Sequence, residues 1–350
     1  MIKSLLEFLQ LAYSTSPFLV SLVAYALLAS MLSASIKKHY KIYYTIFAVI
    51  SFASLIPFLL RMLFGISLPF NLSLIPIFGQ AMNEFSHAAT MVHPLIVIIM
   101  YMGAFSPKIP FVGRLMSIRK ELSIMVGFPV ISHGLRRALA TFPSGWNYFF
   151  NHEEFMQGPR VTSALGSGIS SFVYVLGLVM FILFLVLWIT SFDSVHKKMG
   201  GKSWKSLQKW SYGLYAMLFI HAMGLQIGDL ISYNARQAQQ ASRQRTEQVE
   251  GEQGRSNNTQ QQGAEREQAR QVQQGSQNQQ GQSQATQGQQ QQRTRVRAWS
   301  FTSVVFSSVQ KYWIKMIIYI LVYGSYLFFR IRKSRADKAK KAAAKAQAKA

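Results

Sequence analysis

The chemistry open to this chain of 350 residues rests largely on its seven histidines, because it contains no cysteine. Without thiolates it has no disulfide, no iron–sulfur cluster and no cysteine nucleophile. His133 and His221 stand out because each lies inside an apolar segment. An imidazole in hydrocarbon is costly unless it is paired or ligated. Two interpretations follow: each histidine ligates a cofactor, or it hydrogen-bonds to a neighbouring helix.

The spacing of these two histidines predicts that they lie at one depth in a membrane. His133 follows Arg119 by fourteen residues, and His221 follows Leu207 by the same number. If both segments are helices that start at one face, each imidazole lies about 21 Å from it, at a rise of 1.5 Å per residue. Two imidazoles at one depth on facing helices are what the axial positions of a haem b require. The spacing therefore meets the requirement of a bis-histidine haem site between these two segments, which is the first of the two interpretations.

Apolar blocks must carry these side chains, and they make up much of the chain. Half of the residues are apolar, and they fall in blocks of about twenty, the length that crosses a bilayer core of about 30 Å. The sequence thus predicts an all-α, polytopic transmembrane helical bundle with seven spans, at residues 18–36, 42–64, 85–105, 119–142, 165–192, 207–231 and 312–329. A cleavable signal peptide is the alternative interpretation of the first block.

The distribution of basic residues predicts the orientation. The short loops after the second and fourth spans hold only Arg160. By the positive-inside rule the N-terminus is then outside and the C-terminus is in the cytoplasm. The net charge of +24 therefore reflects topology and contact with lipid, not binding to nucleic acid. The loops after the first, third and fifth spans hold the other loop cations: Lys37, Lys38, Lys41, Lys108, Arg114, Arg119, Lys120, Lys197, Lys198, Lys202 and Lys205.

Composition divides the chain into five parts. These are two N-terminal spans with a connecting segment (1–84), a haem-binding transmembrane core (85–231), a Gln-rich loop (232–298), a final span (299–331) and a basic cytoplasmic tail (332–350). The Gln-rich loop contains almost no large apolar residue from 235 to 297, so it is predicted to be disordered and extracytoplasmic. It is either a neutral insertion or a tether for a partner.

Two motifs in the core carry a resemblance to a known family. The first is Gly200-Gly201-x-x-Trp-Lys-x-Leu207 followed by His221, and the second is Glu121-Leu-Ser-Ile-x-x-Gly-Phe-x-x-x-Ser-His133. Residues 87–231 thereby resemble the ferric-reductase-like transmembrane family, and within it the MsrQ type. The resemblance implies that His133 and His221 are the axial ligands of a haem b. It also implies the inner membrane of a bacterium as the location.

Further residues follow from the same resemblance and from position. Arg136 and Arg137 lie one turn beyond His133 and are suited to haem propionates, unless they only anchor the helix at the interface. His93 is the rival ligand, although a hydrogen-bond partner or a quinone-site residue is the favoured interpretation. Gln208 stands where the family has a histidine for a second haem, so one haem is expected instead of two.

The expected function is electron transfer across the membrane. The chain has neither a Gly-x-Gly-x-x-Gly fingerprint nor a soluble flavin domain, so a flavoprotein, a bound FMN or a quinol must supply the electrons. By resemblance, the acceptor is an extracytoplasmic reductase subunit, the periplasmic methionine sulfoxide reductase. Two alternatives remain: direct reduction of ferric or cupric ions, and a redox-silent transporter or scaffold.

The predicted topology can be tested with single cysteines, because the native chain has none. A cysteine introduced at Ser256 should react with a membrane-impermeant thiol reagent in cells with a permeabilised outer membrane. A cysteine at Ser334, in the basic tail, should react only after the inner membrane is opened. Protection of the Ser256→Cys variant in cells whose outer membrane alone is permeabilised would contradict the placement of the Gln-rich loop.

Overall fold

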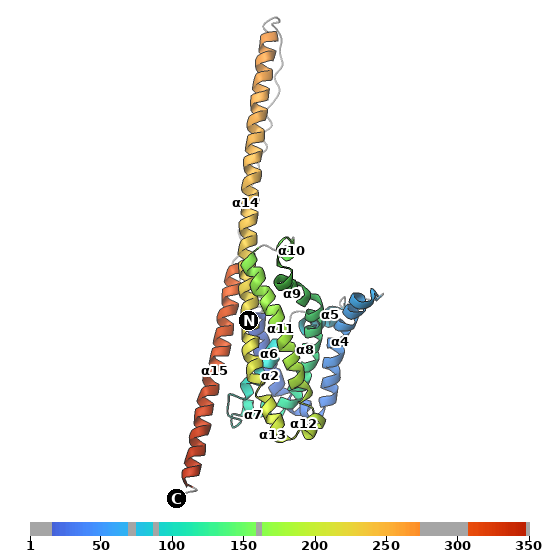
Figure 1. The fold of residues 1–350 in the computed structure, drawn as a ribbon, viewed down its shortest axis with the longest axis vertical. Helices are drawn as coiled ribbons and strands as arrows, with labels where there is room; N and C mark the ends of the chain where they lie inside the picture. Colours follow the sequence, from blue (N-terminus) through green and yellow to red (C-terminus); the bar gives the residue numbers. More distant parts are fainter. Residues whose placement is uncertain (1–15, 69–74, 87–90, 159–162, 274–306, 348–350) are drawn as a thin grey trace, which may run out of the picture. The chain divides into compact units, whose positions relative to one another are not determined.

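The computed structural model of the protein describes residues 16–68, 75–86, 91–158, 163–273 and 307–347. Every regular element in these ranges is an α-helix, and they contain no strand (Figure 1). The helices are α2 (Pro17–Met31), α3 (Ser33–Lys38), α4 (Tyr40–Phe64), α5 (Pro76–Ser86), α6 (Val92–Met102), α7 (Pro110–Ser117), α8 (Arg119–Ala140), α9 (Phe142–Phe150), α10 (His152–Met156), α11 (Ala164–Ile189), α12 (Asp193–Met199), α13 (Gly201–Gln208), α14 (Ser211–Gln273) and α15 (Ser308–Gln347).

Four helical stretches are long and apolar enough to cross a membrane, which supports the prediction of a helical membrane protein. They are Tyr40–Phe64, Ala164–Ile189, Gly201–Gln248 and Ser308–Ala344, and the shorter helices α2 and α6 are also apolar. A helix or a pair of helices lies at each of the seven predicted spans. The helix at the third of them, α6, has only 11 residues. The number of spans therefore stays a prediction.

The chain divides into two compact units. The first contains residues 1–232 and 304–350, and the second contains residues 233–303. The structure differs here from the predicted disordered loop, because α14 continues as a helix to Gln273. Gln, Ala, Glu and Arg have favourable helix propensities, so a segment without apolar residues can still be helical. The rest of the predicted loop, 274–297, lies outside the described residues.

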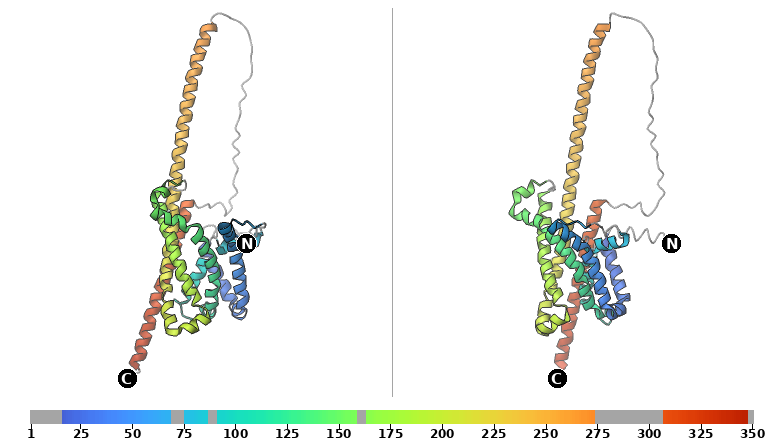
Figure 2. Two further views of the ribbon diagram at one scale, coloured as in Figure 1. Left: turned by 45° about the vertical axis from the view of Figure 1, so that its right-hand side comes forward. Right: turned by 90° about the vertical axis from the view of Figure 1, so that its right-hand side faces the viewer.

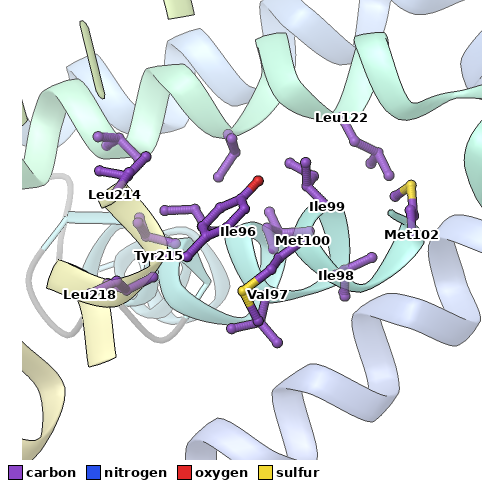
Figure 3. Packing of buried hydrophobic residues seen from close by; sticks show 14 of the residues in the cluster. Ile96, Val97, Ile98, Ile99, Met100, Met102, Leu122, Leu214, Tyr215 and Leu218 are labelled. Carbon is purple, nitrogen blue, oxygen red and sulfur yellow. The ribbon is translucent and has the colours of Figure 1, made fainter. Parts of the chain in front are cut away.

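Helix α6 forms the centre of the first unit. Nearly all of its side chains are buried, and Val97 has no exposed surface. A helix that is apolar all round is buried on all sides. It packs against α2 and α8, and side chains from several helices surround it in Figure 3, including Leu122, Leu214, Tyr215 and Leu218. Position 93, near the start of α6, is thereby held inside the bundle.

Helix α15 is attached to α6 by polar contacts at several levels. The Tyr101 hydroxyl donates to the carbonyl of Val322. The Lys333 ammonium donates to the carbonyl of Phe105 at 2.7 Å and to that of Gly103 at 3.2 Å. These carbonyls lie just beyond the C-terminal end of α6, where helix carbonyls lack partners within the helix. Helix α15 thus completes the unit although it is far from α6 in the sequence.

Glycines allow α8, α11 and α14 to approach one another closely. Figures 1 and 2 show α8 beside α4 and α11. A Cβ atom at Gly127 of α8 would lie 1.8 Å from Nε1 of Trp188 on α11. One at Gly224 of α14 would lie 2.3 Å from Cγ1 of Val173. Small residues at such positions let membrane helices pack backbone to backbone.

We expect Gly127→Ala to destabilise the protein. The added methyl group would displace Trp188, whose indole N–H donates to the carbonyl of Ile124 at 3.1 Å. Overpacking of this kind typically costs about 1–3 kcal/mol, which would appear as a lower unfolding temperature of the solubilised protein. Gly324→Ala is the matched control, because a Cβ atom at this position would have no neighbouring atom within 4 Å. Equal unfolding temperatures for the two variants would contradict this effect of packing.

Candidate functional site

A cavity of about 550 Å³ lies among α2, α6, α8, α11, α14 and α15. This volume falls in the range typical of pockets for cofactors and other small molecules. Three of the described histidines line it: His93 of α6, His133 of α8 and His221 of α14. The structure therefore brings together the two predicted ligands and their rival. Another histidine, His87, lies outside the described residues.

The orientation of His221 is fixed by a hydrogen bond to α11. Its Nδ1 lies 2.8 Å from the carbonyl oxygen of Val173. Because a carbonyl can only accept, Nδ1 carries the proton, and Nε2 of the neutral ring has a lone pair to offer. Metal-bound histidines commonly donate their second N–H to a carbonyl in this way. His221 thus has the tautomer that an axial ligand needs.

A glycine on α11 makes room for this imidazole. A Cβ atom at Gly177 would lie 3.0 Å from Cε1 of His221, which is tighter than nine in ten Cβ contacts in proteins. On α8, Gly134 plays a similar part next to His133, since its Cβ would meet the ring of Phe181 at 2.3 Å. The close approach of α11 to both histidine-bearing helices thus depends on residues without side chains.

The two arginines that follow His133 have different surroundings. Arg137, four residues on, lines the same cavity as His133, as expected for two residues one turn apart. Arg136 faces α4 instead: its guanidinium lies 4.4 Å from the ring centre of Phe58 and 3.4 Å from the carbonyl of Ser54. Arg136 is not among the residues that line this cavity, and its assignment to the cofactor site stays a prediction. A step of one residue turns the side chain to another face of the helix.

His93 contacts residues on two other helices, α2 and α15. Its Nε2 lies 2.8 Å from the hydroxyl of Tyr323 on α15. Its ring centre lies 4.6 Å from that of Phe18 and 5.3 Å from that of Tyr319, which is stacked on it. Because Nε2 is engaged and aromatic rings flank the imidazole, His93 is placed as a hydrogen-bonding residue of the cavity wall.

Charged residues that no sequence motif indicated also line this cavity. They are Asp229, eight residues beyond His221 on α14, and Lys315 of α15. Eight helical residues span about 12 Å, so Asp229 lies well along the helix from the imidazole. Lys315 is the only charged residue in the predicted span 312–329. A lone charge within an apolar segment was the sequence feature that could have identified it.

A second cavity, of about 590 Å³, lies around Gln208. The amide nitrogen of Gln208 donates to the hydroxyl of Thr190 at 3.1 Å, so its hydrogen-bonding capacity is partly used. The wall also includes the carboxylate of Asp193, which is paired with Lys120. Its cations and aromatic rings are Arg119, Lys120, Lys205, Trp188, Trp204, Tyr212 and Tyr215. Such a wall suits a flat molecule with a negative charge.

Among the described residues, no group of three or more His, Asp or Glu side chains is arranged to hold a metal ion by itself. Comparisons of the chain with protein-family models, with curated proteins and with solved structures found no match.

The bond between His93 and Tyr323 should stabilise the fold. Tyr323→Phe removes the hydroxyl that lies 2.8 Å from Nε2 of His93. Such interhelical bonds are worth about 0.6 kcal/mol on average and up to about 1.7 kcal/mol. A double-mutant cycle with His93→Leu, scored by thermal unfolding, should yield a coupling of this size. Tyr319→Phe is the control, because it keeps the ring stacked on His93, and its cycle with His93→Leu should show the smaller coupling.

Proposed function

We propose that this chain is a seven-span membrane protein that binds one haem b and passes electrons to an acceptor on the outer side of a bacterial inner membrane. The observation that carries the proposal is the cavity shared by His133 and His221, with His221 held in the tautomer that leaves Nε2 available. The two ferric-reductase-like motifs end at these two histidines. The sequence resemblance and the geometry thus support the same pair of ligands.

The residues of the cavity fit a haem in their chemistry. Two imidazoles can supply the axial ligands of an iron whose macrocycle brings the other four. Apolar side chains such as Leu218 and Phe184 can cover the faces of a flat ring, and Arg137 supplies a cation for a carboxylate. When bound, the haem would supply one-electron redox chemistry. The chain would hold it, orient it and keep water from it.

The distribution of charge supports the proposed orientation. Several basic side chains make polar contacts at one end of the first unit: Lys120 pairs with Asp193 at 2.6 Å, and Lys333 contacts the end of α6. Arg330 donates to the hydroxyl of Tyr212, at the start of α14. We place this end in the cytoplasm by the positive-inside rule. His133 and His221 then lie in the outer half of the membrane, near the acceptor.

The donor and the acceptor are proposed from chemistry and resemblance. The acceptor would be an extracytoplasmic methionine sulfoxide reductase subunit, as in the MsrQ type. The cavity around Gln208 would take the electron-donating group at the cytoplasmic end. Its cations and aromatic rings, such as Lys205 and Trp204, suit FMN or a quinol headgroup. A separate flavoprotein that docks at this end is the other source of electrons.

Haem ligation can be tested with three alanine variants of the purified protein. His133→Ala and His221→Ala should each abolish the low-spin haem spectrum, because each removes an axial ligand. His93→Ala should keep that spectrum, because it removes only the bond to Tyr323 and the aromatic contacts. The haem-to-protein ratio after full reconstitution should be one.

Other outcomes would change the assignment. A spectrum that is lost in His93→Ala and kept in His221→Ala would place the ligand on α6 instead of α14. A ratio near two would show a second haem despite Gln208. A wild-type protein that binds no haem at all would favour the redox-silent transporter or scaffold. Rapid reduction of added ferric ions without any protein acceptor would favour a metalloreductase.

A further inference from the structure

The 550 Å³ cavity is lined by charged as well as apolar side chains. Three charged residues, Arg137, Asp229 and Lys315, line it together with the histidines. Arg137 lies four residues beyond His133, and Asp229 lies eight beyond His221. At 1.5 Å per residue these offsets are about 6 Å and about 12 Å, and both helices run in the same direction if the proposed topology holds. The charges therefore form a rim beyond the imidazoles, toward the outer surface.

The rim has an excess of positive charge. Two cations face one carboxylate, and Lys315 and Asp229 are close enough to interact electrostatically. Tyr174 lines the same cavity as Arg137 and Asp229. A charge in an apolar span is costly and is usually retained for a function. The net charge of +1 leaves the rim suited to an anionic group.

Lys315 comes from a helix outside the resembling part of the chain. It lies on α15, which follows the Gln-rich segment, whereas the resemblance ends near residue 231. One turn further along α15, Tyr319 lines the cavity and stacks on His93. Helix α15 therefore contributes both a cation and an aromatic ring to the wall of the cavity.

We propose that Lys315 of α15 and Arg137 of α8 bind the carboxylates of the cofactor. Asp229 supplies the opposing charge and so lowers the net positive charge of the rim. This inference rests on the proposed haem site, whose haem has two propionates on one edge. Arg137 offers a planar fork that matches a carboxylate, and Lys315 offers a mobile point charge. The propionates then face the outer surface, and α15 is part of the cofactor site.

The proposal makes a prediction about the reduction potential of the haem. A fixed cation favours the reduced form, which carries one more negative charge, and a fixed anion disfavours it. Lys315→Met should therefore lower the potential, and Asp229→Asn should raise it. We expect about a tenfold change in the ratio of reduced to oxidised haem at a fixed ambient potential. For one electron this corresponds to a shift of about 59 mV in the reduction potential. Two opposite shifts are not expected from residues that serve only packing.

The experiment uses the full-length protein in nanodiscs and measures the potential by spectroelectrochemical titration, together with the rate of haem loss to apomyoglobin. Lys315→Arg should behave as wild type, because it keeps the charge. Lys311→Met is the matched control: it removes a cation one turn earlier on α15 that does not line the cavity. Lys315→Met should also lose haem faster than Lys311→Met.

The outcomes separate this inference from the proposed function. If wild type binds haem through His133 and His221, and Lys315→Met and Lys311→Met have the same potential and the same rate of haem loss, the rim assignment is overturned and the haem site stands. If wild type binds no haem, the proposed function itself is overturned. If Lys315→Met fails to fold, Asp229→Asn is compared with wild type instead. A raised reduction potential of the haem in Asp229→Asn supports the rim assignment, and an unchanged or lowered one overturns it.

Discussion

Polar groups inside a membrane must find partners within the protein, and the arrangement of these helices follows from that requirement. The bond from His221 Nδ1 to the carbonyl of Val173 is the clearest case, since it pairs an imidazole and ties α14 to α11. The His93–Tyr323 pair ties α6 to α15 in the same way. In hydrocarbon, where apolar burial does not drive helices together, such bonds and close packing hold the bundle. The bond to Val173 also fixes which ring nitrogen His221 can offer to a ligand.

Close helix packing and an internal cavity occur side by side in this bundle. Gly177 and Gly134 bring α11 against α14 and α8, and the 550 Å³ cavity stays open between the same helices. Its wall includes Phe18 from α2 and Lys315 from α15, almost three hundred residues apart in the sequence. Its lining combines imidazoles and apolar side chains with three charged residues, Arg137, Asp229 and Lys315. This combination would suit the proposed amphiphilic cofactor, since burying an anionic group without a partner would be costly.

Local sequence determined that this protein is helical and suited to a membrane, and it indicated the candidate site residues. Apolar runs of membrane-spanning length predict helices. A histidine within such a run is conspicuous wherever the helix packs, so His133 and His221 could be identified without a structure. Their expected depth followed from the same pattern, because it depends only on the rise per residue.

The neighbours of each helix, by contrast, followed only from the tertiary structure. Arg136 and Arg137 are adjacent and chemically equal, yet the first packs against α4 and the second lines the cavity. The partner of His93 lies 230 residues away, and Lys315 reaches the site from the last helix. The helical extent of α14 beyond residue 235 also escaped prediction from composition, because polar residues with good helix propensity resemble a disordered segment. Contacts between distant segments depend on how the helices pack, which no local pattern encodes.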